Sequence, residues 1–201
     1  MRASWRFSVS AALLLAASGA CAALAAQDLP PAGYGSLRQD QIAVILSTTN
    51  LTVRVLPLDE RVIRLLAPDT YASLRALKRS RATDMANAAR SSMADSTSAF
   101  FVTFFGLQPD TRFDPDQLYL SSQNVFFRPV GIVPLTPRWS EGTLGQREQA
   151  VAIYLFQSGL PILQPFTVFY GDQRSDAWES NLRTLESERS RVLGRAAARQ
   201  P

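Results

Sequence analysis

The sequence predicts an α+β protein that is mainly β: an antiparallel β-sandwich with one inserted helix and a C-terminal helix. Short runs of β-branched and aromatic residues, separated by turn residues, supply the strands of this sandwich. Two longer stretches place apolar residues at helical spacing, one around residues 69–89 and one around residues 175–195. Seven or eight predicted strands with short turns, together with two helices, favour an antiparallel sandwich with helical additions.

Residues 1–26 have the three parts of a secretory signal peptide. Arg2 and Arg6 precede an uncharged apolar segment, and small residues with the A-x-A cleavage pattern follow. Cleavage there predicts export to the bacterial periplasm or the extracellular space. Cys21 could instead carry a lipid anchor, although Ser18 stands where a lipobox normally has leucine. The third alternative, an uncleaved membrane anchor, fits poorly because the segment consists largely of alanine and serine.

Residues 27–40 then form an expected flexible leader, and residues 41–199 a single β-sandwich domain with two helices. In its first part, Ile42–Ser47 and Leu51–Leu56 predict a hairpin whose second strand alternates apolar and polar residues. Arg61–Leu66 predicts a third strand. The only cysteine is removed with the signal peptide, and a small exported domain without disulfides favours a bacterial envelope compartment.

A helix is predicted from Asp69 through Ala89, followed by a loop over residues 91–98. Phe100–Phe105 has no charge and has aromatic residues on both faces of the pleat. Such a strand would aggregate at a sheet edge, so we expect it at the centre, covered on both faces. The remaining predicted strands are Gln117–Ser122, Val125–Arg128, Gly131–Leu135, Ala150–Phe156 and Phe166–Tyr170.

The chain ends in a predicted helix from Ser175 or Asp176 to Arg195, with Asp176 and Glu179 as a capping box. Its expected apolar stripe comprises Trp178, Leu182, Leu185, Val192, Leu193 and Ala196. The number of predicted strands favours an immunoglobulin-like sandwich as the simplest fold of this class. The cysteine–tryptophan–cysteine core typical of that fold is absent.

The composition excludes several chemistries. The chain has no histidine, which removes histidine-based triads, imidazole metal sites and histidine acid–base catalysis. Without a cysteine in the mature chain, thiol nucleophiles and thiolate metal sites are excluded as well. Beyond the signal peptide, 19 basic residues stand against 17 acidic ones with no basic cluster, so no nucleic-acid partner is expected. No cofactor is expected either, because no phosphate-binding or dinucleotide motif is present.

Acidic residues leave two possibilities open. Asp110, Asp114 and Asp116 gather in one loop and are weak candidates for a Ca²⁺ site, but a solvated turn explains them better. Glu141 and Glu148, like Asp110 and Asp114, could serve a carboxylate-dependent hydrolase acting on envelope glycans. The spacing of these four residues in the sequence does not identify a catalytic pair of carboxylates. Ordinary surface carboxylates would give the same pattern.

The loop containing Arg138, Trp139 and Glu141 is the candidate binding surface, because exposed tryptophan and arginine are enriched at binding hot spots. A tryptophan that folds back over the end of the sandwich is the favoured alternative. The terminal helix is a second candidate contact surface. The leading hypothesis is therefore a non-catalytic exported envelope protein that binds a protein or a cell-wall component, or serves in assembly. The hydrolase is its rival.

Overall fold

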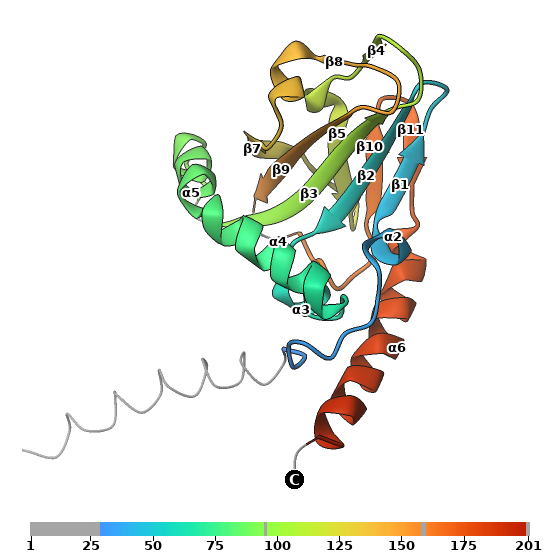
Figure 1. Ribbon diagram of the computed structural model, residues 1–201. Coiled ribbons are helices and arrows are strands. Elements are labelled where there is room, and N and C mark those ends of the chain that lie inside the picture. The colour runs from blue at the N-terminus through green and yellow to red at the C-terminus, as the bar shows by residue number, and fades with distance from the viewer. Residues whose placement is uncertain (1–28, 95, 158–159, 200–201) are drawn as a thin grey trace, which may run out of the picture.

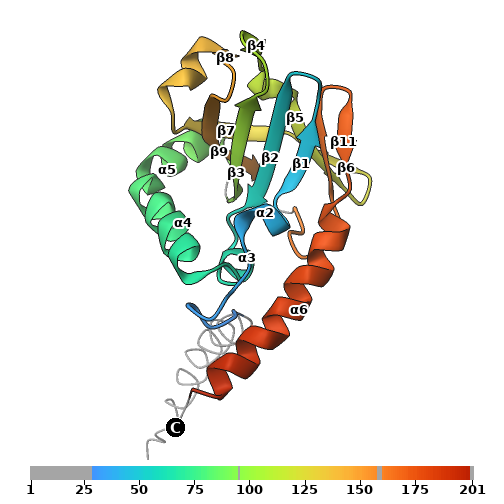
Figure 2. The same ribbon diagram turned by 45° about the vertical axis from the view of Figure 1, so that its right-hand side comes forward.

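The structure, a computed structural model, describes residues 29–94, 96–157 and 160–199 (Figure 1). The expected signal peptide and Cys21 lie outside the described residues. Two antiparallel sheets face each other around the core, and helices lie at one end and along one side of this pair (Figures 1 and 2). The predicted α+β class, with antiparallel sheets and a C-terminal helix, is confirmed.

The larger sheet has five strands in the order β1-β2-β3-β9-β7. All neighbouring pairs are antiparallel, and β3 occupies the centre. The predicted hairpin and the predicted central strand are therefore confirmed. The strands are β1 (Val44–Ser47), β2 (Leu51–Pro57), β3 (Thr97–Gly106), β7 (Pro129–Pro134) and β9 (Gln149–Gln157).

The smaller sheet has four strands in the order β11-β10-β5-β6, and β4 pairs with β8 at the far end of the molecule. Three of these strands, β4, β8 and β11, are too short to give a periodic signal in the sequence. The bounds are β4 (Thr111–Arg112), β5 (Leu118–Ser122), β6 (Val125–Phe127), β8 (Thr143–Leu144), β10 (Thr167–Tyr170) and β11 (Gln173–Ser175).

The core lies between the two sheets. Phe100, Val102 and Phe104 of β3 point into it with no exposed area, while Phe101 and Phe105 on the opposite face are half-buried. Aromatic side chains join the sheets, since the Phe104 ring lies 5.5 Å from that of Tyr170. The expectation that β3 is covered on both faces is thus correct for one face and only partly correct for the other.

The predicted third strand over Arg61–Leu66 is wrong. Residues Glu60–Ile63 form a short helix, α3. The carboxylate of Asp59 accepts a hydrogen bond from the backbone N–H of Arg61 and caps this helix. Val62 and Ile63 are both fully buried, which adjacent residues of a half-covered strand cannot be, because neighbours point to opposite faces.

The single inserted helix expected near residues 69–89 is two consecutive helices, α4 (Pro68–Ser80) and α5 (Ala82–Ser91). Arg81 separates them with a backbone conformation outside the helical region. The short helices α2 (Gln39–Ile42) and α3, and the 3₁₀ turns η1 (Pro115–Gln117) and η2 (Pro137–Glu141), were not expected. Helix and strand consequently contribute about equally to the fold.

The C-terminal helix α6 (Trp178–Ala197) extends away from the sheets (Figure 2). Its first turn is fixed to the core: the indole N–H of Trp178 donates to the carbonyl oxygen of Ile162 at 2.9 Å. The amide of Asn181 donates to the carbonyl oxygen of Ile42 at 3.0 Å. The helix begins after Ala177 without a side-chain cap, so the predicted capping box is absent among these described residues.

The buried face of α6 differs from the predicted stripe. It contains Trp178, Asn181, Leu185, Glu188 and Val192, whereas Leu193 is 50% exposed. The two polar members of this face are held by hydrogen bonds to other segments, which is how they tolerate burial. Glu188 is only 1% exposed.

Glu188 fixes the second half of the expected flexible leader. One of its carboxylate oxygens accepts hydrogen bonds from the backbone N–H and the hydroxyl of Ser36, each at 2.8 Å, and also from Arg195. Leu37 is buried, and Arg38 precedes α2. Ser36, through Glu188, and the buried Leu37 thus attach this part of the predicted leader to α6 and the core.

Across the described residues, no helix is long and apolar enough to cross a membrane.

We predict that Glu188→Gln lowers the free energy of unfolding by about 1–3 kcal/mol at neutral pH. Burial raises the pKa of Glu188, but the hydrogen bonds from Ser36 and Arg195 outweigh it and hold the pKa below its ordinary value. The ionised carboxylate thus stabilises the fold above the unfolded-state pKa of about 4.3, and this contribution is lost as the pH falls through the folded-state value. Urea unfolding of both proteins across acidic pH measures it. An unchanged acid dependence in the variant would contradict this role.

Candidate functional site

The predicted binding loop forms the 3₁₀ turn η2 at the far end of the sandwich. Trp139 is half-buried there, and its ring lies 5.6 Å from that of Phe104, 5.4 Å from that of Phe113 and 5.9 Å from that of Tyr154. The tryptophan therefore covers one end of the core, as the alternative interpretation expected. Its neighbours Arg138 and Glu141 are exposed.

Arg138 joins the two glutamates of the hydrolase hypothesis. Its guanidinium donates to the carboxylate of Glu141 and, at 2.9 Å, to that of Glu148. The hydrogen bond and charge of Glu141, followed by the charge of Glu148, raise the pKa of Arg138. Glu148 also accepts from the backbone N–H of Gly145 at 2.9 Å. The structure thus brings Arg138, Glu141 and Glu148 together, with both carboxylates engaged by one cation.

The acidic loop is held by local hydrogen bonds. Asp114 caps η1, with one carboxylate oxygen accepting from the backbone N–H of Asp116 at 3.0 Å and the other from the amide of Gln117 at 3.2 Å. Asp110 adopts a left-handed backbone conformation in the preceding turn. No group of three acidic side chains able to hold a metal ion occurs within residues 29–94, 96–157 and 160–199.

A cluster of aromatic rings lies on the outer face of the smaller sheet. Tyr119 of β5 and Phe169 of β10 are cross-strand partners, and their rings stack with centroids 4.7 Å apart and planes 3° from parallel. Phe126 of β6 meets both rings edge-on, at 6.0 and 6.5 Å. Phe126 is 67% exposed, and the neighbouring Val125 is 53% exposed. We call Tyr119, Phe126 and Phe169 the aromatic face.

Polar groups flank the aromatic face. The guanidinium of Arg128 lies over the Tyr119 ring, 5.6 Å from its centroid. On the other side of the stack, a hollow of about 270 Å³ is lined by Thr167, Phe169, Arg174 and Asp176. The hydroxyl of Thr167, the guanidinium of Arg174 and the carboxylate of Asp176 therefore lie beside the Phe169 ring. The aromatic face thus offers both apolar contact and hydrogen-bonding groups.

The hairpin between β5 and β6 presents the most exposed of these rings. Gln123 and Asn124 at its tip both have positive φ angles, as the tight turn between two antiparallel strands requires. Ser121 of β5 pairs with Phe126, which places this ring on the same outer face as Tyr119 two residues away. The local turn geometry thus fixes where Phe126 points.

The aromatic face was missed in the sequence because its members come from three separate strands. Each local pattern holds a signal: Tyr119 lies between the buried residues Leu118 and Leu120, and Phe169 lies between Val168 and Tyr170. Alternation places both aromatics on the solvent side, where an exposed aromatic residue is informative. Strand pairing, which the sequence alone does not supply, is what brings them together.

The outer face of the larger sheet carries a second kind of surface. A hollow of about 460 Å³ there is lined by Phe101, Thr103 and Phe105 of β3, with Arg54 of β2 and Asp40 of α2 among the residues at its rim. This floor is half-buried, as are Tyr119 and Phe169, and no ring on it is as exposed as Phe126.

Comparison with known proteins gave no match: no family model, no curated protein and no solved structure is significantly similar to this chain.

We predict that Trp139→Ala lowers the free energy of unfolding by about 3 kcal/mol, because it removes a ring packed on three core aromatics. Arg138→Ala, which removes an exposed side chain with surface ion pairs, should change it by less than about 1 kcal/mol. Chemical unfolding followed by circular dichroism measures both. Equal, small effects would indicate that Trp139 is free for recognition.

Proposed function

We propose that this protein is a non-catalytic binding module of the bacterial envelope, exported by its N-terminal signal peptide, and that it binds a glycan strand of the cell wall through the aromatic face. The observation that carries the proposal is a cluster of three aromatic rings on the solvent side of a sheet, one of them 67% exposed. Exposed large apolar groups gathered in one place are typical of interaction surfaces.

The chemistry around the rings favours a glycan. A sugar ring combines apolar C–H faces with hydroxyl groups around its rim, so its binding surface needs aromatic area next to polar donors and acceptors. Phe126 and Phe169 supply aromatic area, while Arg174, Asp176 and Thr167 supply donors and acceptors beside Phe169. Sites of this type combine mostly apolar walls with a few placed polar groups.

The rings are also held in position before any ligand arrives. The Tyr119 and Phe169 rings stack on each other, and Arg128 lies over Tyr119, so these side chains lose little conformational freedom on binding. Binding in place of hydrolysis is supported by the state of the acidic groups. Glu141 and Glu148, the glutamates that a carboxylate-dependent hydrolase could use, are both paired with Arg138.

The proposal predicts that Phe126→Ala weakens binding to purified peptidoglycan sacculi by about tenfold, the size of effect typical of a hot-spot residue. The change removes an exposed ring, so the fold should remain intact. Cosedimentation of the purified mature protein with sacculi, over a range of sacculus concentrations, gives the affinity.

Phe105→Ala is the matched control, because it removes the same side chain from the outer face of the other sheet. This variant should bind as the unaltered protein does. If it weakened binding while Phe126→Ala did not, the hollow over β3 would be the site and the proposal would be wrong. If the protein released soluble fragments from the sacculi, and Glu141→Gln or Glu148→Gln abolished this release, the protein would be a hydrolase and not a binding module.

A further inference from the structure

A third hollow, separate from the aromatic face and from the hollow over Phe101 and Phe105, lies between α5, the end of α4 and the outer face of the larger sheet. Its volume is about 460 Å³, within the range of about 300–1,000 Å³ found for small-molecule sites. One wall comes from α5, where Met85, Ala86 and Ala89 face the hollow, and another from Ala99 of β3 and Leu155 of β9.

The packing of α5 explains why this space stays open. All ten residues of α5 are exposed or half-buried, although the helix lies against the sheet. Contact is close at β7, where a Cβ added to Gly131 would lie 3.0 Å from that of Ala88. Two of the three α5 residues that line the hollow are alanines, Ala86 and Ala89, and their side chains are too short to fill it. Leu58, Ala99, Leu155 and Ile162 complete the apolar part of the lining, and Thr97 and Ser98 add two hydroxyl groups.

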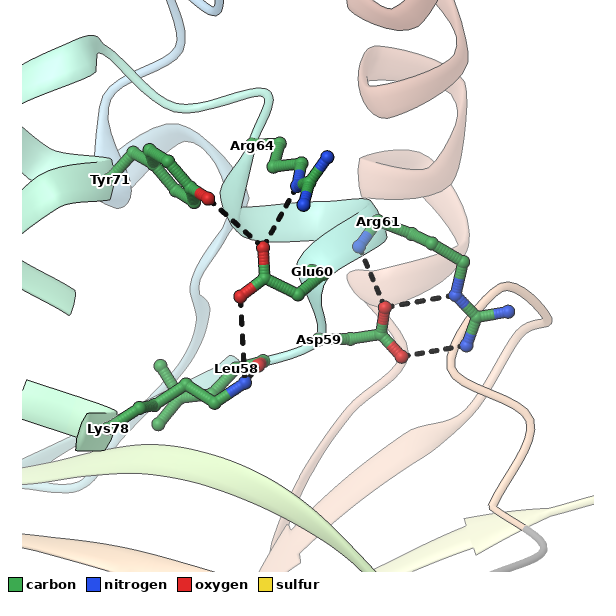
Figure 3. A network of polar contacts seen from close by, with 7 residues as sticks. All are labelled: Leu58, Asp59, Glu60, Arg61, Arg64, Tyr71 and Lys78. Atoms are coloured by element: carbon green, nitrogen blue, oxygen red, sulfur yellow. Dashed lines mark hydrogen bonds and ion pairs between the residues drawn. The ribbon is translucent and has the colours of Figure 1, made fainter. Parts of the chain in front are cut away.

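One end of the hollow is charged. Lys78 of α4 lies there beside Asp59 and Glu60, and Figure 3 shows their contacts. The Glu60 carboxylate already accepts from the Nε of Arg64 at 2.9 Å and from the hydroxyl of Tyr71 at 3.2 Å. The Nζ of Lys78 lies 4.0 Å from the other carboxylate oxygen of Glu60, which is beyond hydrogen-bond distance. The charge of Lys78 is therefore only partly neutralised by Glu60.

Lys78 also has hydrogen-bonding capacity to offer. An ammonium group carries three N–H donors. Within the described part of the chain, the Nζ of Lys78 makes one hydrogen bond, to the carbonyl oxygen of Leu58 at 2.8 Å (Figure 3). This bond fixes the ammonium at the end of the hollow and leaves donors for an incoming anion.

We propose that this hollow binds a straight-chain fatty carboxylate, with its carboxylate on Lys78 and its alkyl chain between α5 and the outer face of the larger sheet. Charge complementarity selects the head group. The two carboxylates at that end are paired with arginines, Asp59 with Arg61 and Glu60 with Arg64, so Lys78 supplies the remaining positive charge. The alanine and methionine walls select the chain. A neutral amphiphile leaves the Lys78 donors without an anionic partner, and a short carboxylate leaves the apolar walls uncovered.

Lys78 is the only lysine in the chain, which makes the site directly observable. Reductive ¹³C-methylation labels Lys78 and the N-terminal amine, and the variant Lys78→Arg identifies the Lys78 signal by its disappearance. Decanoate, kept below its micelle concentration, should shift the Lys78 signal to saturation with one site per protein. Calorimetry on the unlabelled protein gives the affinity. Octanoate should bind about tenfold more weakly than decanoate, and acetate should not shift the signal.

Lys78→Met tests the contribution of the charge, and Ala89→Leu tests the contribution of the cavity. Lys78→Met should weaken decanoate binding by about tenfold or more, the factor expected for one charge-assisted hydrogen bond. Arg79→Met, which removes an exposed charge from the next position of α4, is its control and should bind as the unaltered protein does. Ala89→Leu should fill the hollow and block binding, while its thermal melting shows that the fold is retained.

The proposal is overturned if decanoate produces no saturable shift at Lys78. It is equally overturned if Arg79→Met costs as much affinity as Lys78→Met, or if a folded Ala89→Leu variant binds decanoate normally. Each result would show that the carboxylate does not bind in this hollow through Lys78.

Discussion

The structure depends on the alternation of side chains along β3, the central strand of the larger sheet. Its even-numbered residues Phe100, Val102 and Phe104 are completely buried and fill the space between the sheets. Because consecutive side chains in a strand point to opposite faces, Phe101, Thr103 and Phe105 necessarily lie outside. The same ten-residue strand therefore builds the core and the floor of an outer surface. Its two neighbours, β2 and β9, pair with it in register and extend both layers.

The two surfaces proposed for binding lie where this arrangement leaves sheet faces incompletely covered. Helix α5 lies against β7 and β9 of the larger sheet and leaves a hollow that ends at Lys78 of α4. The smaller sheet turns its inner residues toward Phe100 and Phe104 and presents Tyr119 and Phe169 on the other side. Its outer face is where aromatic area and polar groups meet. The terminal helix is held by Trp178, Asn181 and Glu188, which use contacts to distant segments.

The sequence predicted the elements with a strong local pattern. Phe100–Phe105 and Ala150–Phe156 are predicted as strands because a short, uncharged and largely apolar run is typical of a buried strand. Arg61–Leu66 was misassigned because its β-branched residues outweighed Asp59, whose capping role shows only in the hydrogen bond to Arg61. The stripe on α6 was misplaced because an apolar pattern cannot mark Asn181 and Glu188 as buried. Their partners, Ile42 and Ser36, are more than one hundred residues away. The aromatic face and the Lys78 hollow depend on the same long-range pairing and could not be located beforehand.

The central claim, that one face of β3 holds the fold and the other lines an outer surface, is tested most directly by comparing two adjacent phenylalanines. Urea unfolding of Phe104→Ala and Phe105→Ala measures the free energy that each ring contributes. Phe104→Ala should lower it by about 3–5 kcal/mol, as for a fully buried aromatic residue. Phe105→Ala should lower it by about 1 kcal/mol, the typical effect of a substitution outside the core. Equal losses, or a larger loss for Phe105→Ala, would contradict the claim.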